Sequence, residues 1–323
     1  MRLTAPAERA PAERAPAESA RAEDAARYDQ RRVRSIHNAY AKEQSVFDQL
    51  THYAVRSLEL DLVPTKCDSG AWGDSCPSEC TGLDCGARDD DWFVYHAQVI
   101  LPDEHRTSCL RLSDCLAELS AFHRQDPGHS VVTVFLDLKR EALLEDGTRT
   151  GDDLDGRLGR HLPRDSIFTP ADLADRCFDP TQGGSLADAA RTCGWPRLSE
   201  LTGKFIFVLT GESGTERYAA GGTMARARRA FVASRGLAAR APWTVFANLT
   251  DRDLDAAPAD APHDGLVRRV YAVGRCLPVL EMCTWAGGFD DVVVPDADIQ
   301  HLAIDRVGPT VAPALGPLGL ADL

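Results

Sequence analysis

The residues best suited to chemistry are acidic side chains within two apolar segments. Glu59 and Asp61 lie two positions apart in the alternating segment 57–63, and Asp137 interrupts the apolar run 131–138. Side chains two positions apart on a strand share a face, and an unpaired carboxylate is costly to bury. Calcium takes oxygen ligands of this kind. The pattern predicts a hard-cation site with the ligands Asn38, Glu59, Asp61 and Asp137.

Two histidines and a lysine accompany these acids. His37 directly precedes Asn38, His96 lies in the β-like segment 92–100, and Lys139 follows Asp137 by two positions. Beside a cation, such groups suit general acid/base catalysis on a phosphodiester. Each residue also has a simpler, structural interpretation. Surface histidines and strand-end lysines are common, and Glu59 and Asp61 could lie on a solvated strand face.

The surrounding pattern alternates between strands and helices. Helical spacing is found at 45–55 and 110–123, and strands are predicted at 32–36, 57–63, 92–100, 131–138, 204–209 and 243–247, with weaker candidates at 266–273 and 291–294. The Arg-rich segment 225–240 predicts a solvated helix face. Alternation of this kind indicates a parallel α/β sheet. Since no dinucleotide-binding glycine motif follows the first strand, a closed barrel is favoured, with its chemistry at the carboxyl ends of the strands.

Composition changes divide the chain. The Ala/Pro/Glu/Arg repeat of residues 1–30 cannot bury a core and is predicted to be a disordered extension. Residues 31–323 are expected to form a single barrel domain. The Cys/Gly/Asp-rich stretch at about 64–91 is expected to be an insertion into that domain.

Ten cysteines without a C-x-x-C pair favour disulfides over a zinc site. The closest neighbours predict the bridges Cys109–Cys115 and Cys177–Cys193. An oxidising compartment follows, so the protein is expected to be secreted or associated with the cell envelope, although residues 1–27 contain no apolar signal segment.

The charge balance restricts the partners. Thirty-six Lys and Arg residues against 49 Asp and Glu give a net charge of −13. Nucleic-acid binding requires clustered cations, so that class is excluded. Strong adhesion to an anionic membrane is disfavoured for the same reason.

Four motifs in order resemble a known family. SIHNAY (35–40), LELDL (58–62), VYH (94–96) and VVTVFLDLK (131–139) look like the bacterial, calcium-dependent, phosphatidylinositol-specific phospholipase C family, and the similarity covers about residues 30–275.

The resemblance implies a distorted TIM-type (β/α)8 barrel that uses Ca2+. It implies that His37 and His96 are catalytic, that Lys139 neutralises the phosphate, and that Arg268 is a plausible second phosphate-binding residue. The same four residues, Asn38, Glu59, Asp61 and Asp137, match the metal ligands. The substrate would be phosphatidylinositol, cleaved to diacylglycerol and a cyclic inositol phosphate. A monomer in transient contact with a membrane surface is expected.

Departures from the family pattern leave alternatives open. Asp137 stands where relatives commonly carry glutamate, and LVRRVYAV at 266–273 departs from the expected motif. One alternative is a phosphodiesterase of the same fold that acts on glycerophosphodiesters or other phospholipids. The other is a catalytically silent, secreted binding module.

Overall fold

The computed structural model describes most of the central chain. The described residues are 25–31, 33–63, 91–95, 107–139, 149–179, 184–211, 213–220, 228–236, 241–250, 265–270 and 301–304. His96, most of the N-terminal extension, nearly all of the insertion and the strand predicted at 291–294 lie outside them. The predicted domain boundaries therefore stay predictions.

The strands form a closed ring. Eight of the nine strands found in the described residues run parallel in the order β1-β9-β8-β7-β6-β5-β4-β2, and β2 pairs again with β1 through Ile36 and Leu58. Their bounds are β1 Val33–Ile36, β2 Ser57–Val63, β4 Val132–Leu138, β5 Phe205–Thr210, β6 Ala230–Arg235, β7 Phe246–Leu249, β8 Val267–Val270 and β9 His301–Ile304. A short strand, β3 (Phe93–Val94), pairs antiparallel with the end of β2. The predicted α/β barrel is confirmed.

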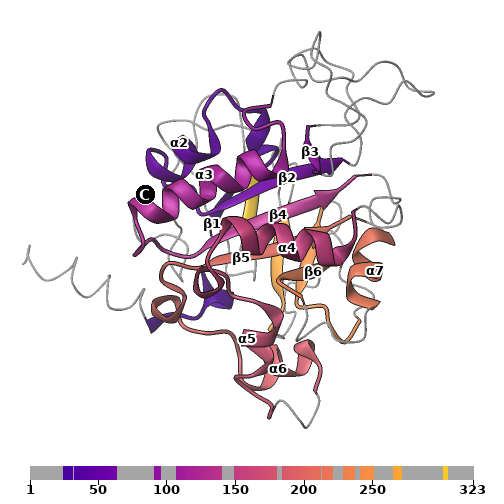
Figure 1. Ribbon diagram of the computed structural model, residues 1–323. Helices are drawn as coiled ribbons and strands as arrows, with labels where there is room; N and C mark the ends of the chain where they lie inside the picture. Colours follow the sequence, from indigo (N-terminus) through magenta and orange to yellow (C-terminus); the bar gives the residue numbers. More distant parts are fainter. Residues whose placement is uncertain are drawn as a thin grey trace, which may run out of the picture.

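Helices lie outside the strands, as Figure 1 shows. They are α2 Val46–Thr51, α3 Leu112–Gln125, α4 Gly151–His161, α5 Pro170–Ala174, α6 Leu186–Thr192 and α7 Ser213–Ala220, with 3-10 turns η1 Tyr28–Gln30, η2 Ala39–Ala41, η6 Arg164–Ser166 and η7 Leu198–Leu201. Between β6 and β9 the structure describes only residues 236, 241–250 and 265–270, and these contain no helix. None of the described helices is long and apolar enough to cross a membrane.

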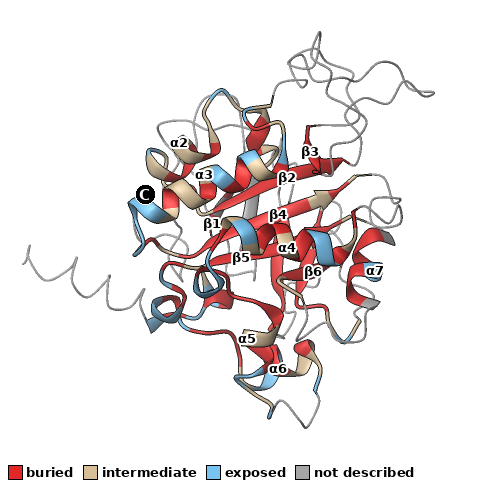
Figure 2. Ribbon diagram, in the orientation of Figure 1, coloured by how far each residue is buried: buried red, intermediate tan, exposed pale blue. Residues whose placement is uncertain are grey.

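Burial follows from this architecture (Figure 2). All seven residues of β2 are buried, because one face packs against helices and the other faces the barrel interior. Aromatic side chains fill the amino-terminal half of the interior: Trp195 lies 5.0 Å from Tyr28 and 5.4 Å from Phe246, measured between ring centroids. The Tyr28 hydroxyl also forms a 2.7 Å hydrogen bond with Thr133 at the start of β4.

The predicted Arg-rich helix at 225–240 is wrong. Residues Ala230–Arg235 form β6, and its first four residues are buried. The flanking arginines imitate a solvated helix, yet Arg228 lies before the strand and pairs with Asp152 and Asp155 of α4. The short apolar run Ala-Phe-Val-Ala fits a buried parallel strand, and this preference decides the local structure.

Both predicted disulfides are confirmed. Cys109 is bonded to Cys115 and Cys177 to Cys193. The first bridge closes the segment that leads into α3, and the second fastens the turn after α5 to the end of α6. The remaining six cysteines lie outside the described residues.

Candidate active and metal site

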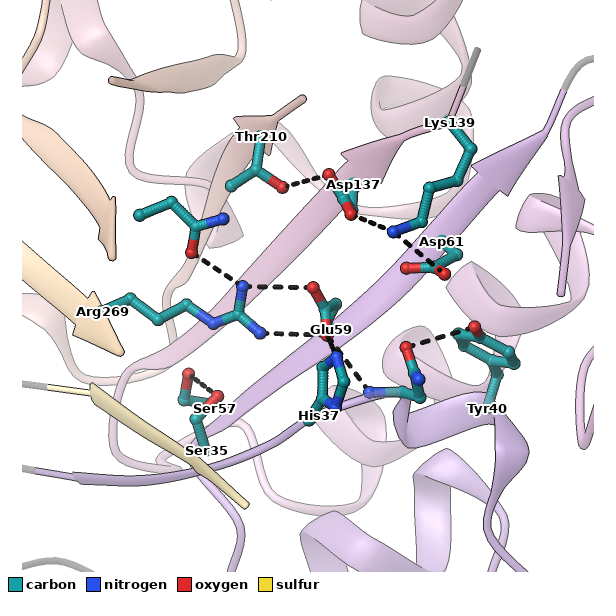
Figure 3. Close-up of polar contacts among 12 residues, drawn as sticks. Ser35, His37, Tyr40, Ser57, Glu59, Asp61, Asp137, Lys139, Thr210 and Arg269 are labelled. Carbon is teal, nitrogen blue, oxygen red and sulfur yellow. Dashed lines mark hydrogen bonds and ion pairs between the residues drawn. The ribbon is translucent and has the colours of Figure 1, made fainter. Parts of the chain in front are cut away.

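The register of β2 against β4 builds an acidic cluster. Asp61 is paired directly with Asp137, and Glu59 lies two positions earlier on the same face of β2. Oxygen atoms of these three carboxylates lie within 4.8 Å of one another. Figure 3 shows them converging near the carboxyl ends of both strands. The convergence expected from the sequence is therefore found for these three carboxylates.

Glu59 is held by an arginine from the far side of the ring. Its Oε1 and Oε2 lie 3.1 and 3.0 Å from the two terminal nitrogens of Arg269 on β8. His37 Nε2 lies 3.4 Å from the same carboxylate. Burial opposes ionisation of Glu59, but the positive charges of Arg269, His37 and Lys139 outweigh it and lower the pKa to about 2. Glu59 is therefore an anion at any physiological pH.

Arg269 is itself fully buried and needs compensation. One of its terminal nitrogens donates a 3.0 Å hydrogen bond to Asn248 on β7, and the guanidinium lies 4.6 Å from the ring centroid of Phe135. These contacts fix the arginine in the barrel interior, where Figure 3 shows its guanidinium directed at Glu59. A buried cation is thus built into the floor of the acidic cluster.

Lys139 connects the other two carboxylates. Its ammonium lies 3.3 Å from Asp61 and also contacts Asp137. Burial opposes its charge, yet Asp61, Asp137 and Glu59 raise the pKa of Lys139 above its ordinary value. Thr210, at the end of β5, donates a 2.8 Å hydrogen bond to Asp137 and sets the orientation of that carboxylate.

The turn after β1 brings His37 and Asn38 to this cluster. Asn38 has a φ of 50°, in the left-handed region that asparagine tolerates better than most residues. Its backbone N–H donates to Glu59 Oε2 at 3.2 Å, and its side-chain Oδ1 accepts a 3.2 Å hydrogen bond from the Tyr40 hydroxyl. Burial and the nearby carboxylates raise the pKa of Tyr40 well above its ordinary value, so this hydroxyl keeps its proton.

The predicted phosphate-binding residue Arg268 and its neighbour Arg269 differ in placement. Neighbouring residues on a strand point to opposite faces, so Arg269 faces Glu59 while Arg268 faces the outer side. There Arg268 donates to the carbonyl of Leu266 at 3.4 Å. The substrate role of Arg268 stays a prediction, and this placement favours a structural one.

Four contributors were missed by the sequence reasoning: Tyr40, Thr210, Asn248 and Arg269. Tyr40 stands inside the SIHNAY motif, and Thr210 is a polar residue at the end of a buried strand, the same signal that marked Asp137. The importance of Asn248 depends on its pairing with Arg269 across β7 and β8. Sequence carries no sign of that register.

The approach to His96 is fixed although that residue lies outside the described part of the chain. β3 pairs with the end of β2 through Leu62 and Val94. Just before it, Asp91 forms an ion pair with Arg157 of α4 at 3.2 Å. The chain thus reaches Tyr95 at the same end of the barrel as Asp61.

The donor set suits a hard cation. Three buried or half-buried carboxylates and a nearby amide oxygen match calcium, which binds six to eight oxygen ligands including waters. The described residues of this cluster contribute no thiolate, which a softer metal would favour. The residues present therefore fit Ca2+.

Comparison with known proteins agrees with this chemistry. The sequence model for Ca2+-dependent phosphoinositide phospholipase C matches residues 15–269. Among curated proteins, no sequence matches.

Solved structures share the fold. The calcium-dependent phosphoinositol-specific phospholipase C of a Gram-negative Pseudomonas species is 22% identical, with a TM-score of 0.67, over 93% of this chain and 97% of that chain. Its myo-inositol complex is 21% identical, with a TM-score of 0.66 over the same shares. The Ca2+-dependent phosphatidylinositol-specific enzyme of Streptomyces antibioticus is 20% identical, with a TM-score of 0.66, over 90% of this chain and 98% of that one.

At these identities the structural likeness supports the fold, whereas the sequence match, which spans well over half of the chain, supports the family. The protein belongs to the Ca2+-dependent phosphoinositide phospholipase C family and is a phosphodiesterase.

Proposed function

We propose that this enzyme cleaves the phosphodiester of phosphatidylinositol to diacylglycerol and a cyclic or acyclic inositol phosphate. The observation that carries the proposal is the convergence of Glu59, Asp61 and Asp137 beside His37 and Lys139. These groups combine a hard-cation site, a proton-transfer group and a fixed ammonium at one mouth of the barrel. Acid/base catalysis and positive charge beside the phosphate both favour phosphodiester cleavage.

Asn38, Glu59, Asp61 and Asp137 are the proposed calcium ligands. When bound, calcium supplies a divalent positive charge beside the phosphate. Lys139 adds a second positive charge near Asp61, so the mouth can attract an anionic headgroup although the whole chain carries −13.

His37 and His96 are the proposed acid/base pair. The ionised Glu59 orients the His37 ring through Nε2 and stabilises the positive charge that develops when the imidazole accepts a proton. Arg269 keeps Glu59 ionised and in place. His96 would act as the second acid/base from the segment that follows Tyr95.

The test is hydrolysis of phosphatidylinositol vesicles with calcium or with EGTA, with products followed by phosphorus NMR. We expect activity only with calcium, and a loss of at least about 100-fold in His37→Ala, the usual contribution of a general acid/base. The matched control is His52→Ala, at the exposed end of α2 and paired only loosely with Asp48 at 3.7 Å. It should remain fully active.

The outcomes separate the rival functions. Activity that resists EGTA refutes the calcium role, and full activity in His37→Ala refutes the catalytic assignment. Turnover of glycerophosphodiesters instead of phosphatidylinositol identifies the related phosphodiesterase. Calcium binding without turnover of any phosphodiester identifies a silent binding module.

We also propose that the enzyme works outside the cytoplasm, as a monomer in brief contact with a lipid surface. Two disulfides support the compartment, because such bonds persist in oxidising environments. The net charge of −13 opposes lasting adhesion to anionic lipids. Light scattering for mass, and vesicle sedimentation at low and high salt, test these statements: a stable dimer or salt-resistant pelleting contradicts them.

A further inference from the structure

We propose that Tyr40 is a positioning residue for the calcium site, whose hydroxyl holds the Asn38 side-chain oxygen in its ligating orientation. This inference rests on the ligand set in the proposed function. It concerns the affinity for the cation rather than the chemical step, because the hydroxyl contacts the proposed ligand Asn38.

The hydroxyl of Tyr40 contacts a proposed ligand. It donates to Asn38 Oδ1 at 3.2 Å. Tyr40 has no exposed surface. A hydroxyl in such a place has no water to replace its partners, so its hydrogen bond constrains the Asn38 side chain strongly.

The hydrogen bond decides which end of the Asn38 amide can face a cation. A side-chain amide has an oxygen that can bind a cation and an NH2 group that cannot. The amide oxygen of Asn38 has two lone pairs, so it can accept from Tyr40 and still face a metal ion. Partners of this kind, which orient the ligands of a metal, typically change its affinity 10- to 100-fold when removed.

The turn that carries Tyr40 is held by other contacts as well. The Gln49 side chain donates to the carbonyls of Ala39 and Gln44 at 2.8 and 2.9 Å. The Tyr40 carbonyl accepts from the Ser108 N–H at 2.7 Å. Because these bonds do not involve the hydroxyl, Tyr40→Phe should leave the η2 turn in place and remove a single interaction.

The chain offers a matched control in Tyr28. It is also buried inside the barrel, and its hydroxyl also forms one side-chain hydrogen bond, to Thr133 at 2.7 Å. Thr133 lies at the amino-terminal end of β4, far along the strand from Asp137. Tyr28→Phe thus removes a comparable bond away from the proposed ligands.

The experiment is calorimetric titration of the full-length, metal-free protein with CaCl2. We expect Tyr40→Phe to raise the calcium Kd about 10-fold or more, and Tyr28→Phe to change it less than about twofold. In hydrolysis assays, the calcium concentration for half-maximal rate should rise by the same factor in Tyr40→Phe. The kcat at saturating calcium should stay within about threefold of the wild-type value.

A second pair of variants tests the orientation itself. In Asn38→Asp both terminal atoms of the side chain are oxygens, so its orientation matters less for binding a cation. In this background, Tyr40→Phe should raise the calcium Kd by a smaller factor than it does in the wild type. Equal effects in both backgrounds, or an unchanged Kd in folded Tyr40→Phe, overturn the role of Tyr40 alone. A wild-type protein that does not bind calcium overturns the proposed ligand set, and the role of Tyr40 with it. If Tyr40→Phe does not fold, the hydroxyl serves the fold and the positioning role is likewise refuted.

Discussion

Replacement of Arg269 by methionine tests the electrostatic design of the site most directly. The substitution removes the charge that lies 3.0 and 3.1 Å from Glu59 and leaves that carboxylate buried. The surroundings lower the pKa of Glu59 from 4.5 to about 2, which corresponds to about 3 kcal/mol in favour of the ionised form. Breaking a buried ion pair on one side typically costs about 3–5 kcal/mol. We expect Arg269→Met to lose stability in that range.

The assay is urea unfolding at pH 7 in EDTA, for the wild type, Arg269→Met, Glu59→Gln and the double variant. In the wild type, the stability contributed by ionised Glu59 is present above pH 4.5 and is lost as the pH falls through about 2, so at pH 7 it is complete. Glu59→Gln in the Arg269→Met background should recover a large part of the loss, because the buried charge is then gone.

The reasoning is refuted if Arg269→Met costs less than about 1 kcal/mol, the size expected of a surface pair. It is also refuted if the two substitutions add without coupling, because residues in one ion pair are expected to couple by 0.5–3 kcal/mol.

Three further outcomes are expected. Burial lowers the pKa of His129 below 6.5, so the stability that its neutral form contributes is present above pH 6.5 and is lost as the pH falls below that value. His129→Gln should therefore reduce the change in the free energy of unfolding, measured in urea, between about pH 7.5 and 5.5. An unchanged pH dependence contradicts this. Replacing Cys109 and Cys115 by alanine should cost about 2 kcal/mol, the value for so short a loop, and a Tm insensitive to both substitution and reductant contradicts it. Lys139→Met removes the ammonium beside Asp61 and should lower kcat/KM for phosphatidylinositol about 100-fold. Arg268→Met should leave KM within about twofold of the wild-type value, because Arg268 faces the outer side of the barrel. A large effect of Arg268→Met on KM would restore the predicted substrate role of Arg268.

Much of the site could be predicted because it depends on local spacing. Glu59 and Asp61 alternate with buried leucines, and Asp137 stands in a run where a carboxylate needs a reason to be buried. Both patterns predict which side chains share a face, because side chains on a strand alternate with a period of two. The strand predicted over 57–63 matches β2 from end to end.

Pairing between distant strands could not be predicted. Arg269 and Arg268 are equivalent in sequence, and only the position of β8 in the ring decides which one faces Glu59. β6 was concealed by its flanking arginines, and one of them, Arg228, has its partners on α4, remote in sequence. β9 (His301–Ile304) was not predicted, because four residues give too little pattern to distinguish a strand from a loop.

The closure of the barrel between β1 and β2 links the stability of the scaffold to calcium binding. The β1–β2 pairing amounts to Ile36 opposite Leu58, so this junction is a seam with little backbone ladder to hold it. Side chains fasten it instead: Ser57 donates to Ser35 at 2.8 Å below, and Glu59 accepts from Asn38 above. A cation shared by Asn38 and Glu59 would act as a clasp across that seam. Loss of calcium should then inactivate the enzyme and loosen the β1–β2 junction together. Hydrogen exchange of the β1 amides should therefore become faster when calcium is removed.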